Sequence, residues 1–116
     1  MLAQQFRVTT ADEYRAAVRR GARFVSANTV TYVLKGDGSQ NDGRPRFGFI
    51  VSKQVGIAVV RNRVRRRLKA AGYELLPSVT APADVVVRVL PAGSTASYAQ
   101  FASELRRSLA KAGMLA

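Results

Sequence analysis

A run of basic residues from Arg61 to Lys69 is the densest set of side chains in this sequence that can do chemistry. Between Ala58 and Ala70, six of thirteen residues are Arg or Lys and none is acidic. On a helix, like charges four residues apart, such as Arg61 and Arg65, cost about 0.2–0.5 kcal/mol for each pair. Guanidinium groups bind phosphate through parallel hydrogen bonds. The run therefore predicts a binding site for a polyanion, in preference to a merely solvated basic helix face.

Asn62 interrupts this run and adds a different chemistry. Its side-chain amide can both donate and accept hydrogen bonds, to a base, a sugar or an ion bound to phosphate. Asn is no better a helix former than Glu or Lys, so helix stability does not explain its presence. Asn62 is either part of the polyanion site or an incidental polar residue on the surface, and both interpretations stay open.

The composition supports a polyanionic partner and excludes several kinds of enzyme. Nineteen basic and seven acidic residues give a net charge of +12, which favours nucleic acid or, less often, an anionic membrane surface. There is no Cys and no His, so a disulfide, a thiolate nucleophile, an imidazole base and a zinc site built from these residues are excluded. The carboxylates are scattered, apart from adjacent Asp12 and Glu13. We therefore expect no catalytic side chain and no metal site in the chain itself.

Length and hydropathy predict a single domain over residues 1–116 and a cytoplasmic protein. The segment MLAQQFRVTT lacks the apolar core of a signal peptide. No apolar stretch reaches the roughly 18 residues that a membrane span needs. A peripheral membrane protein would need a broad exposed apolar helix face, so we expect no membrane partner.

The periodicity of apolar residues predicts an α+β sandwich of three helices and three strands, in the order αββαβα. Thr10, followed by Asp12 and Glu13, is typical of a helix start. The second strand is almost continuously apolar, which favours a central position, and Gly48 within it indicates a close approach or a bulge. The predicted helices are 11–20, about 57–71 with Gly72 as the stop, and 97–113; the predicted strands are 28–36, 46–53 and 84–90; residues 36–45 are a predicted loop.

The basic helix must be docked for its charges to face a partner. A narrow apolar stripe runs along it at steps of three and four residues, which puts the members on one helix face. That face can pack against the sheet, and the cations then occupy the remaining surface. The stripe consists of Ile57, Val60, Val64, Leu68 and Ala71.

The segment FGFIVSKQVGIAVVRNRVRRRLKAA resembles the signature region of the bacterial ribonuclease P protein subunit family. In that family a strand ending in Val-Ser-Lys and a Val-Gly turn lead into a helix that carries Arg-Asn-Arg. Here these elements are Val51-Ser52-Lys53, Val55-Gly56 and Arg61-Asn62-Arg63. ADEYRAAVRRGARF is similar to the family's first helix, and DVVVRVLPAGSTASYAQFASEL to its third strand and last helix, so the resemblance covers nearly the whole chain.

The resemblance implies a fold, a function and two binding surfaces. The fold is a small α-β sandwich, ribosomal protein S5 domain 2-like, whose basic helix lies in a left-handed βαβ crossover. The function is that of a protein subunit, expected to form a one-to-one complex with ribonuclease P RNA. In that complex the RNA, with Mg²⁺ bound mainly by the RNA, removes the 5′ leader from precursor tRNA. The implied RNA-binding residues are Arg61, Asn62, Arg63, Arg65, Arg66, Lys69 and Lys53; the implied leader-binding cleft contains Tyr14, Val18 and Tyr32.

The sequence departs from the family pattern at two functional positions. Val18 stands where a second aromatic residue is common, and Lys53-Gln54 replaces a pair of lysines.

Other interpretations of the sequence are a different RNA-binding protein, such as a ribosomal component, and a DNA-binding module that places the basic helix in a major groove. DNA is not the expected partner, because the basic helix follows a strand and not a second helix. A self-sufficient hydrolase is disfavoured by the absence of His and the scattered carboxylates.

Overall fold

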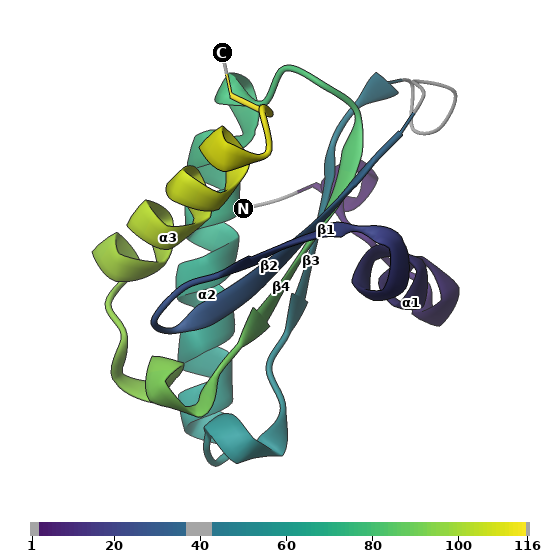
Figure 1. Ribbon diagram of the computed structural model, residues 1–116. Coiled ribbons are helices and arrows are strands. Elements are labelled where there is room, and N and C mark those ends of the chain that lie inside the picture. The colour runs from purple at the N-terminus through teal and green to yellow at the C-terminus, as the bar shows by residue number, and fades with distance from the viewer. Residues whose placement is uncertain (1–2, 37–42, 116) are drawn as a thin grey trace.

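A computed structural model describes residues 3–36 and 43–115 of the chain, which form one four-stranded sheet with helices on both faces (Figure 1). Most of the predicted 36–45 loop lies outside the described residues. The strand order is β1-β2-β4-β3, in which β3 and β4 are parallel and the other pairs are antiparallel. The strands are β1 (Ala22–Val25), β2 (Thr29–Lys35), β3 (Arg46–Ile50) and β4 (Ala83–Val89).

Two helices cover one face of the sheet and one helix covers the other (Figure 1). The helices are α1 (Ala11–Arg20), α2 (Ala58–Leu75) and α3 (Tyr98–Lys111). Helices α2 and α3 lie together on one face, and α1 packs against β2 and β4 on the opposite face. Helix α2 connects the parallel neighbours β3 and β4, so it lies in the βαβ crossover. The α+β sandwich is confirmed.

The predicted order αββαβα is one strand short. Strand β1 was missed, although it pairs with β2 from Ala22 opposite Val33 to Val25 opposite Val30. It has only four residues, lies at the edge of the sheet and is mostly exposed. A short edge strand buries too little surface to need a regular apolar alternation, so its sequence carries almost no strand signal.

The predicted central position of the second strand is also wrong, because β3 lies at the other edge of the sheet. Its apolar composition has a different cause, which is that both faces of β3 are covered. Phe47 packs into the core beneath α2, while the Tyr14 ring of α1 lies over Gly48 on the opposite face. The outer edge is partly paired as well, since the Val8 N–H donates to the Phe47 carbonyl at 2.8 Å.

Helix α2 differs from its prediction at both ends. It continues through a buried Gly72 to Leu75, and Pro77 follows in the short 3-10 helix η4 (Leu76–Ser78). Burial outweighs the low helix propensity of glycine here, because Gly72 is buried and α2 packs against α3. At the other end, Ile57 is 72% exposed and precedes the helix, so it does not belong to the apolar stripe.

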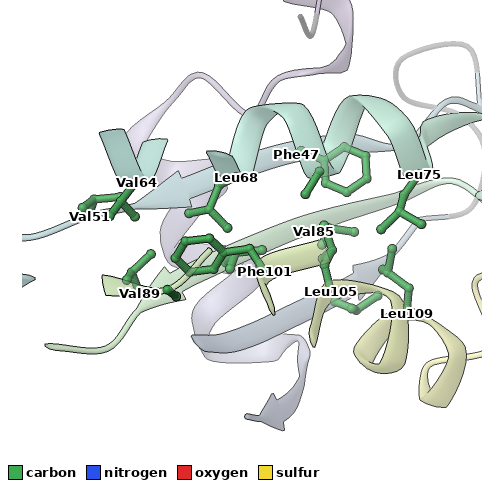
Figure 2. Packing of buried hydrophobic residues seen from close by; sticks show 14 of the residues in the cluster. Phe47, Val51, Val64, Leu68, Leu75, Val85, Val89, Phe101, Leu105 and Leu109 are labelled. Atoms are coloured by element: carbon green, nitrogen blue, oxygen red, sulfur yellow. The ribbon is translucent and has the colours of Figure 1, made fainter. Parts of the chain in front are cut away.

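The main core lies between the sheet and the pair α2 and α3. Figure 2 shows Val64, Leu68 and Leu75 of α2 turned toward the strands and α3. From α3, Phe101 and Leu105 point into the same layer. Truncating one such buried Leu to Ala costs about 2–5 kcal/mol. The predicted apolar stripe from Val64 to Ala71 is therefore confirmed as the docking face of α2.

Helix α1 is fixed on the second face by a capping box and an ion-pair network. The Thr10 hydroxyl accepts from the Glu13 N–H, and the Glu13 carboxylate accepts from the Thr9 and Thr10 N–H groups. The same carboxylate accepts from Arg46 Nη1 at 2.6 Å, and Arg46 binds Asp84 through two parallel hydrogen bonds of 2.8 Å. One guanidinium thus joins α1, β3 and β4.

Charges shift the acidity of both partners in this network. Burial raises the pKa of the Glu13 carboxyl, but the hydrogen bonds from Thr10, Thr9 and Arg46 outweigh burial and lower this pKa from 4.5 to about 2. The hydrogen bond to Asp84, supported by Glu13, raises the pKa of Arg46 against the opposing effect of burial. Arg46 therefore stays charged, and Glu13 keeps its charge in the folded chain at pH values that protonate an ordinary carboxyl.

Replacing Glu13 with Gln is predicted to destabilise the fold in a pH-dependent way. Gln retains the capping box but loses the charge, so we expect a loss of about 1–2 kcal/mol at pH 7. In the parent chain this stabilisation is complete above pH 4.5 and is lost as the pH falls toward 2, where the folded carboxyl also protonates. Urea unfolding from pH 7 to pH 2 measures both effects. Asp12→Asn, at an exposed side chain, is the control, and equal losses for both variants at every pH would contradict the prediction.

Candidate nucleic-acid interface

On one flank of α2, arginine side chains bind backbone carbonyls of the segment between β3 and α2. Arg61 Nε donates to the Gly56 carbonyl at 3.2 Å, and Arg65 Nη2 donates to the Val51 carbonyl at 3.4 Å. Arg65 Nη1 also donates to the Asn62 side-chain oxygen at 3.1 Å. Asn62 therefore helps to orient an arginine, and its amide NH₂ remains available at an exposed position.

The other flank of α2 is held in the same way to η5 (Pro91–Thr95), the 3-10 helix after β4. Arg63 Nη2 donates to the Ser94 carbonyl at 3.2 Å, and Arg67 Nη1 donates to the Ala96 carbonyl at 2.6 Å. The Arg63 Nε lies buried without a hydrogen-bond partner. Arg63 and Arg67 thus hold the chain after β4 against α2. A bound phosphate can use only those guanidinium N–H groups that do not already donate to these carbonyls.

Between the two flanks, the outward face of α2 carries side chains that form no ion pair within the described chain. Asn62 and Arg66 are exposed, Lys69 is partly exposed, and Tyr73 is 54% exposed further along the same face. Lys53 is exposed in η3 (Lys53–Val55), just before α2. The structure therefore brings the predicted RNA-binding residues together on one helix and its leading turn.

The cations of α2 form no ion pair among the described residues. Over residues 3–36 and 43–115, ion pairs form only at Arg15, which pairs with Asp12, and at Arg46. The first turn of α2 contains no acid and has no side-chain cap, so its N–H groups add to the positive potential. This surface can attract and hold a polyanion.

The predicted cleft residues lie on the opposite face of the sheet, around α1. A Cβ built on Gly48 would lie 2.7 Å from Tyr14 Cε1, so this glycine is what allows the Tyr14 ring to rest on β3. Tyr14 and Val18 are partly buried, and each retains some exposed surface. Tyr32 is different, because it is only 5% exposed and packs in the small core beneath α1.

Two cations on this face were not singled out by the sequence interpretation. Arg88 of β4 is exposed, and its guanidinium carbon lies 5.8 Å from the centroid of the Tyr32 ring. Arg23 of β1 is exposed and lies directly across from Tyr32 in the sheet register. The sequence does contain one indication, since Arg88 is a single charged residue in the otherwise apolar run VVVRVL. A charge at this place in a strand indicates that part of the sheet face that carries α1 is open to solvent.

No group of three His, Cys, Asp or Glu side chains comes together anywhere in the described ranges. The carboxylates of Glu13 and Asp84 are already bound by Arg46.

Within residues 3–36 and 43–115, no helix is long and apolar enough to cross a membrane.

Comparisons with known proteins agree on one family. The family model described as Ribonuclease P matches residues 2–113. The ribonuclease P protein component of Clavibacter michiganensis subsp. michiganensis is 43% identical over 112 residues, covering 97% of this chain and 96% of that protein. The ribonuclease P protein component of Mycolicibacterium gilvum is 42% identical over 109 residues, covering 94% of this chain and 87% of that protein.

Solved structures share the fold. The RNase P protein of Staphylococcus aureus superposes with a TM-score of 0.82 at 19% identity, covering 96% of this chain and 98% of that one. The RNase P protein of Thermotoga maritima superposes with a TM-score of 0.77 at 16% identity, covering 90% of this chain and 96% of that one. At these identities the likeness concerns the arrangement of helices and strands.

Neighbouring arginines of α2 are predicted to separate into structural and binding roles. Arg67→Gln removes the 2.6 Å hydrogen bond to the Ala96 carbonyl, so we expect unfolding free energy to fall by about 1–2 kcal/mol. Arg66→Gln removes an exposed side chain with no partner in the described chain, so we expect less than about 0.5 kcal/mol and weaker binding to structured RNA. Urea unfolding and filter binding of both variants measure the difference. Equal stabilities would show that the contact with Ala96 does not hold η5 in place.

Proposed function

Because this chain belongs to the ribonuclease P protein family, we propose that it binds the catalytic RNA of ribonuclease P and the 5′ leader of precursor tRNA. In this proposal the chain is one subunit of an endoribonuclease whose chemistry is carried out by the RNA. The observation that carries the proposal is the docked helix α2, whose outward cations have no acidic partner among the described residues.

The basic surface of α2 is suited to a place where phosphates of two RNA molecules are crowded. Arg66, Lys69 and Lys53 supply charge that forms no ion pair among the described residues. Arg61 and Arg65 are held in fixed directions by backbone carbonyls. A guanidinium oriented in this way loses less conformational entropy when it binds phosphate. Asn62, through its NH₂ group, provides a hydrogen-bond donor to a phosphate or a sugar beside these charges.

The face around α1 is suited to a single-stranded leader. The partly exposed Tyr14 ring offers a surface on which a base can stack, worth about 1–3 kcal/mol. Val18, one turn later on α1, provides apolar contact without stacking. Helix α1 keeps these residues in place through the Glu13–Arg46–Asp84 network described above.

The chain's own contribution to cleavage is binding and orientation. Mg²⁺, held in our proposal by the RNA, supplies the charge stabilisation for phosphodiester hydrolysis. The carboxylates described above do not form a set that would hold this ion, so no step is assigned to a protein carboxylate. The basic helix assists by lowering the repulsion between enzyme RNA and substrate RNA, which otherwise needs more counter-ions.

Reconstitution is predicted to show that the protein stimulates cleavage without cleaving by itself. Precursor tRNA is mixed at low Mg²⁺ with protein alone, with cognate ribonuclease P RNA alone, or with both. We expect rapid release of the 5′ leader only with both, because the protein compensates for the missing counter-ions. Cleavage by the protein alone, or no stimulation, would contradict the proposal.

Binding of the protein to RNA is predicted to weaken steeply with salt. If about five phosphates are contacted, the slope of log affinity against log salt concentration is about −3.5 on single-stranded RNA. Filter binding between 50 and about 200 mM salt measures this slope. A response near zero would show that the cations of α2 remain solvated in the complex.

A further inference from the structure

We propose that Arg88 binds a phosphate of the leader, and that Tyr32 is a positioning residue that supports the Arg88 guanidinium and does not itself stack on a base. This inference rests on the proposed function and assigns a new chemistry to one part of the leader-binding face. It starts from the way side chains are arranged in rows across the sheet.

Strand register places Arg88 in the open part of the face that carries α1. One row contains Gly48, Val86, Tyr32 and Arg23 from β3, β4, β2 and β1. The next row contains Ile50, Arg88, Val30 and Val25 in the same strand order. The ring of Tyr14 occupies the β3 end of the first row, above Gly48. The second row is open at Arg88, which is exposed, and at Val25, which is 63% exposed.

Tyr32 is poorly placed to stack on a base. It is 5% exposed, and its neighbours in the small core include Val8, Ala17 and Val86. The Arg88 guanidinium lies 5.8 Å from the ring centroid, within the roughly 6 Å range of a cation–π interaction. The solvent side of Tyr32 is therefore already occupied by a cation.

Arg88 is well placed to bind phosphate. A guanidinium has five N–H donors in its plane, so contact with a ring leaves its N–H edges directed to solvent. Arg88 pairs with no carboxylate within the described ranges, where ion pairs involve only Arg15 and Arg46. Exposed Arg23, opposite Tyr32 on β1, adds a second positive charge to the same region. A single-stranded phosphodiester is the ligand that fits a fixed guanidinium beside an apolar surface.

A phosphate contact at Arg88 also compensates for Val18, which stands where the family commonly has a second aromatic residue. Val18 cannot stack on a base, so the face has one partly exposed aromatic ring, Tyr14, near α1. A phosphate contact at Arg88 holds the leader without depending on base identity, because every nucleotide carries the same phosphate. Leader affinity is then divided between one stacking position and one charged position.

The test measures affinity of the reconstituted holoenzyme for precursor tRNA and for mature tRNA without a leader. Arg88→Gln is expected to weaken binding of precursor tRNA by about five- to tenfold, without changing the affinity for mature tRNA. The salt slope for precursor tRNA should become shallower by about 0.7. Arg106→Gln, at an exposed position of α3 on the other face of the sheet, is the matched control and should change neither quantity.

A double-mutant cycle tests the supporting role of Tyr32. Tyr32→Phe keeps the ring and should bind precursor tRNA like the parent, whereas Tyr32→Leu should weaken binding. In an Arg88→Gln background, Tyr32→Leu should have no further effect, because the ring then has no guanidinium to support. Urea unfolding of each variant verifies that it is folded under the binding conditions, and the Arg88→Gln comparison still tests the inference if Tyr32→Leu does not fold.

Two results would overturn the inference. One is an Arg88→Gln holoenzyme with parental affinity and salt slope for precursor tRNA. The other is an equal loss from Tyr32→Leu with and without Arg88, which would mean that the ring contacts the leader directly. Affinity for ribonuclease P RNA, measured separately, distinguishes these outcomes from failure of the proposed function, since a protein that does not bind that RNA overturns both.

Discussion

Repulsion among the cations of α2 is tolerated because the opposite side of this helix is buried. Three like-charge pairs four residues apart, such as Arg61 and Arg65, together cost about 1 kcal/mol on an isolated helix. Val64, Leu68 and Ala71 are completely buried, and one buried Leu alone contributes about 2–5 kcal/mol relative to Ala. The free energy gained by burying this side of α2 is therefore much larger than the cost of the repulsion. The helix therefore needs no acidic residue between its cations, and their charge remains available to a partner.

Most of the acidic residues that the structure describes bind partners within the fold and do not neutralise the basic surface. Glu13 and Asp84 bind Arg46 and join α1 to the sheet. Glu104 of α3 is 4% exposed and accepts hydrogen bonds from Asn28 and Thr29, which fixes the turn between β1 and β2. Carboxylates that are already bound within the fold do not reduce the positive potential of the basic surface. A polyanion that approaches this surface is therefore attracted mainly by its cations.

The sequence was most informative where one local signal had no competitor. Thr10, followed by acids in the first turn, predicted the start of α1, and the apolar stripe predicted the docked face of α2. Predictions failed where tertiary contacts decided. Gly72 remains helical because of packing between α2 and α3, and β1 exists because β2 offers an edge. The carbonyl contacts of Arg63 and Arg67 were equally hidden, since they join α2 to a segment about thirty residues away in the sequence. No local pattern encodes such a contact.

Cations are held by two different means on the two faces, and the means determine what each face can recognise. Backbone carbonyls fix Arg61 and Arg65 on α2, which gives several directed charges on one rigid helix and suits a structured RNA whose phosphates have fixed positions. Arg88 rests on an aromatic ring instead, and a cation–π contact constrains distance more than direction. A guanidinium held in this way can follow a flexible strand. In the proposed function both faces bind phosphate, and such contacts do not depend on the base sequence of the partner.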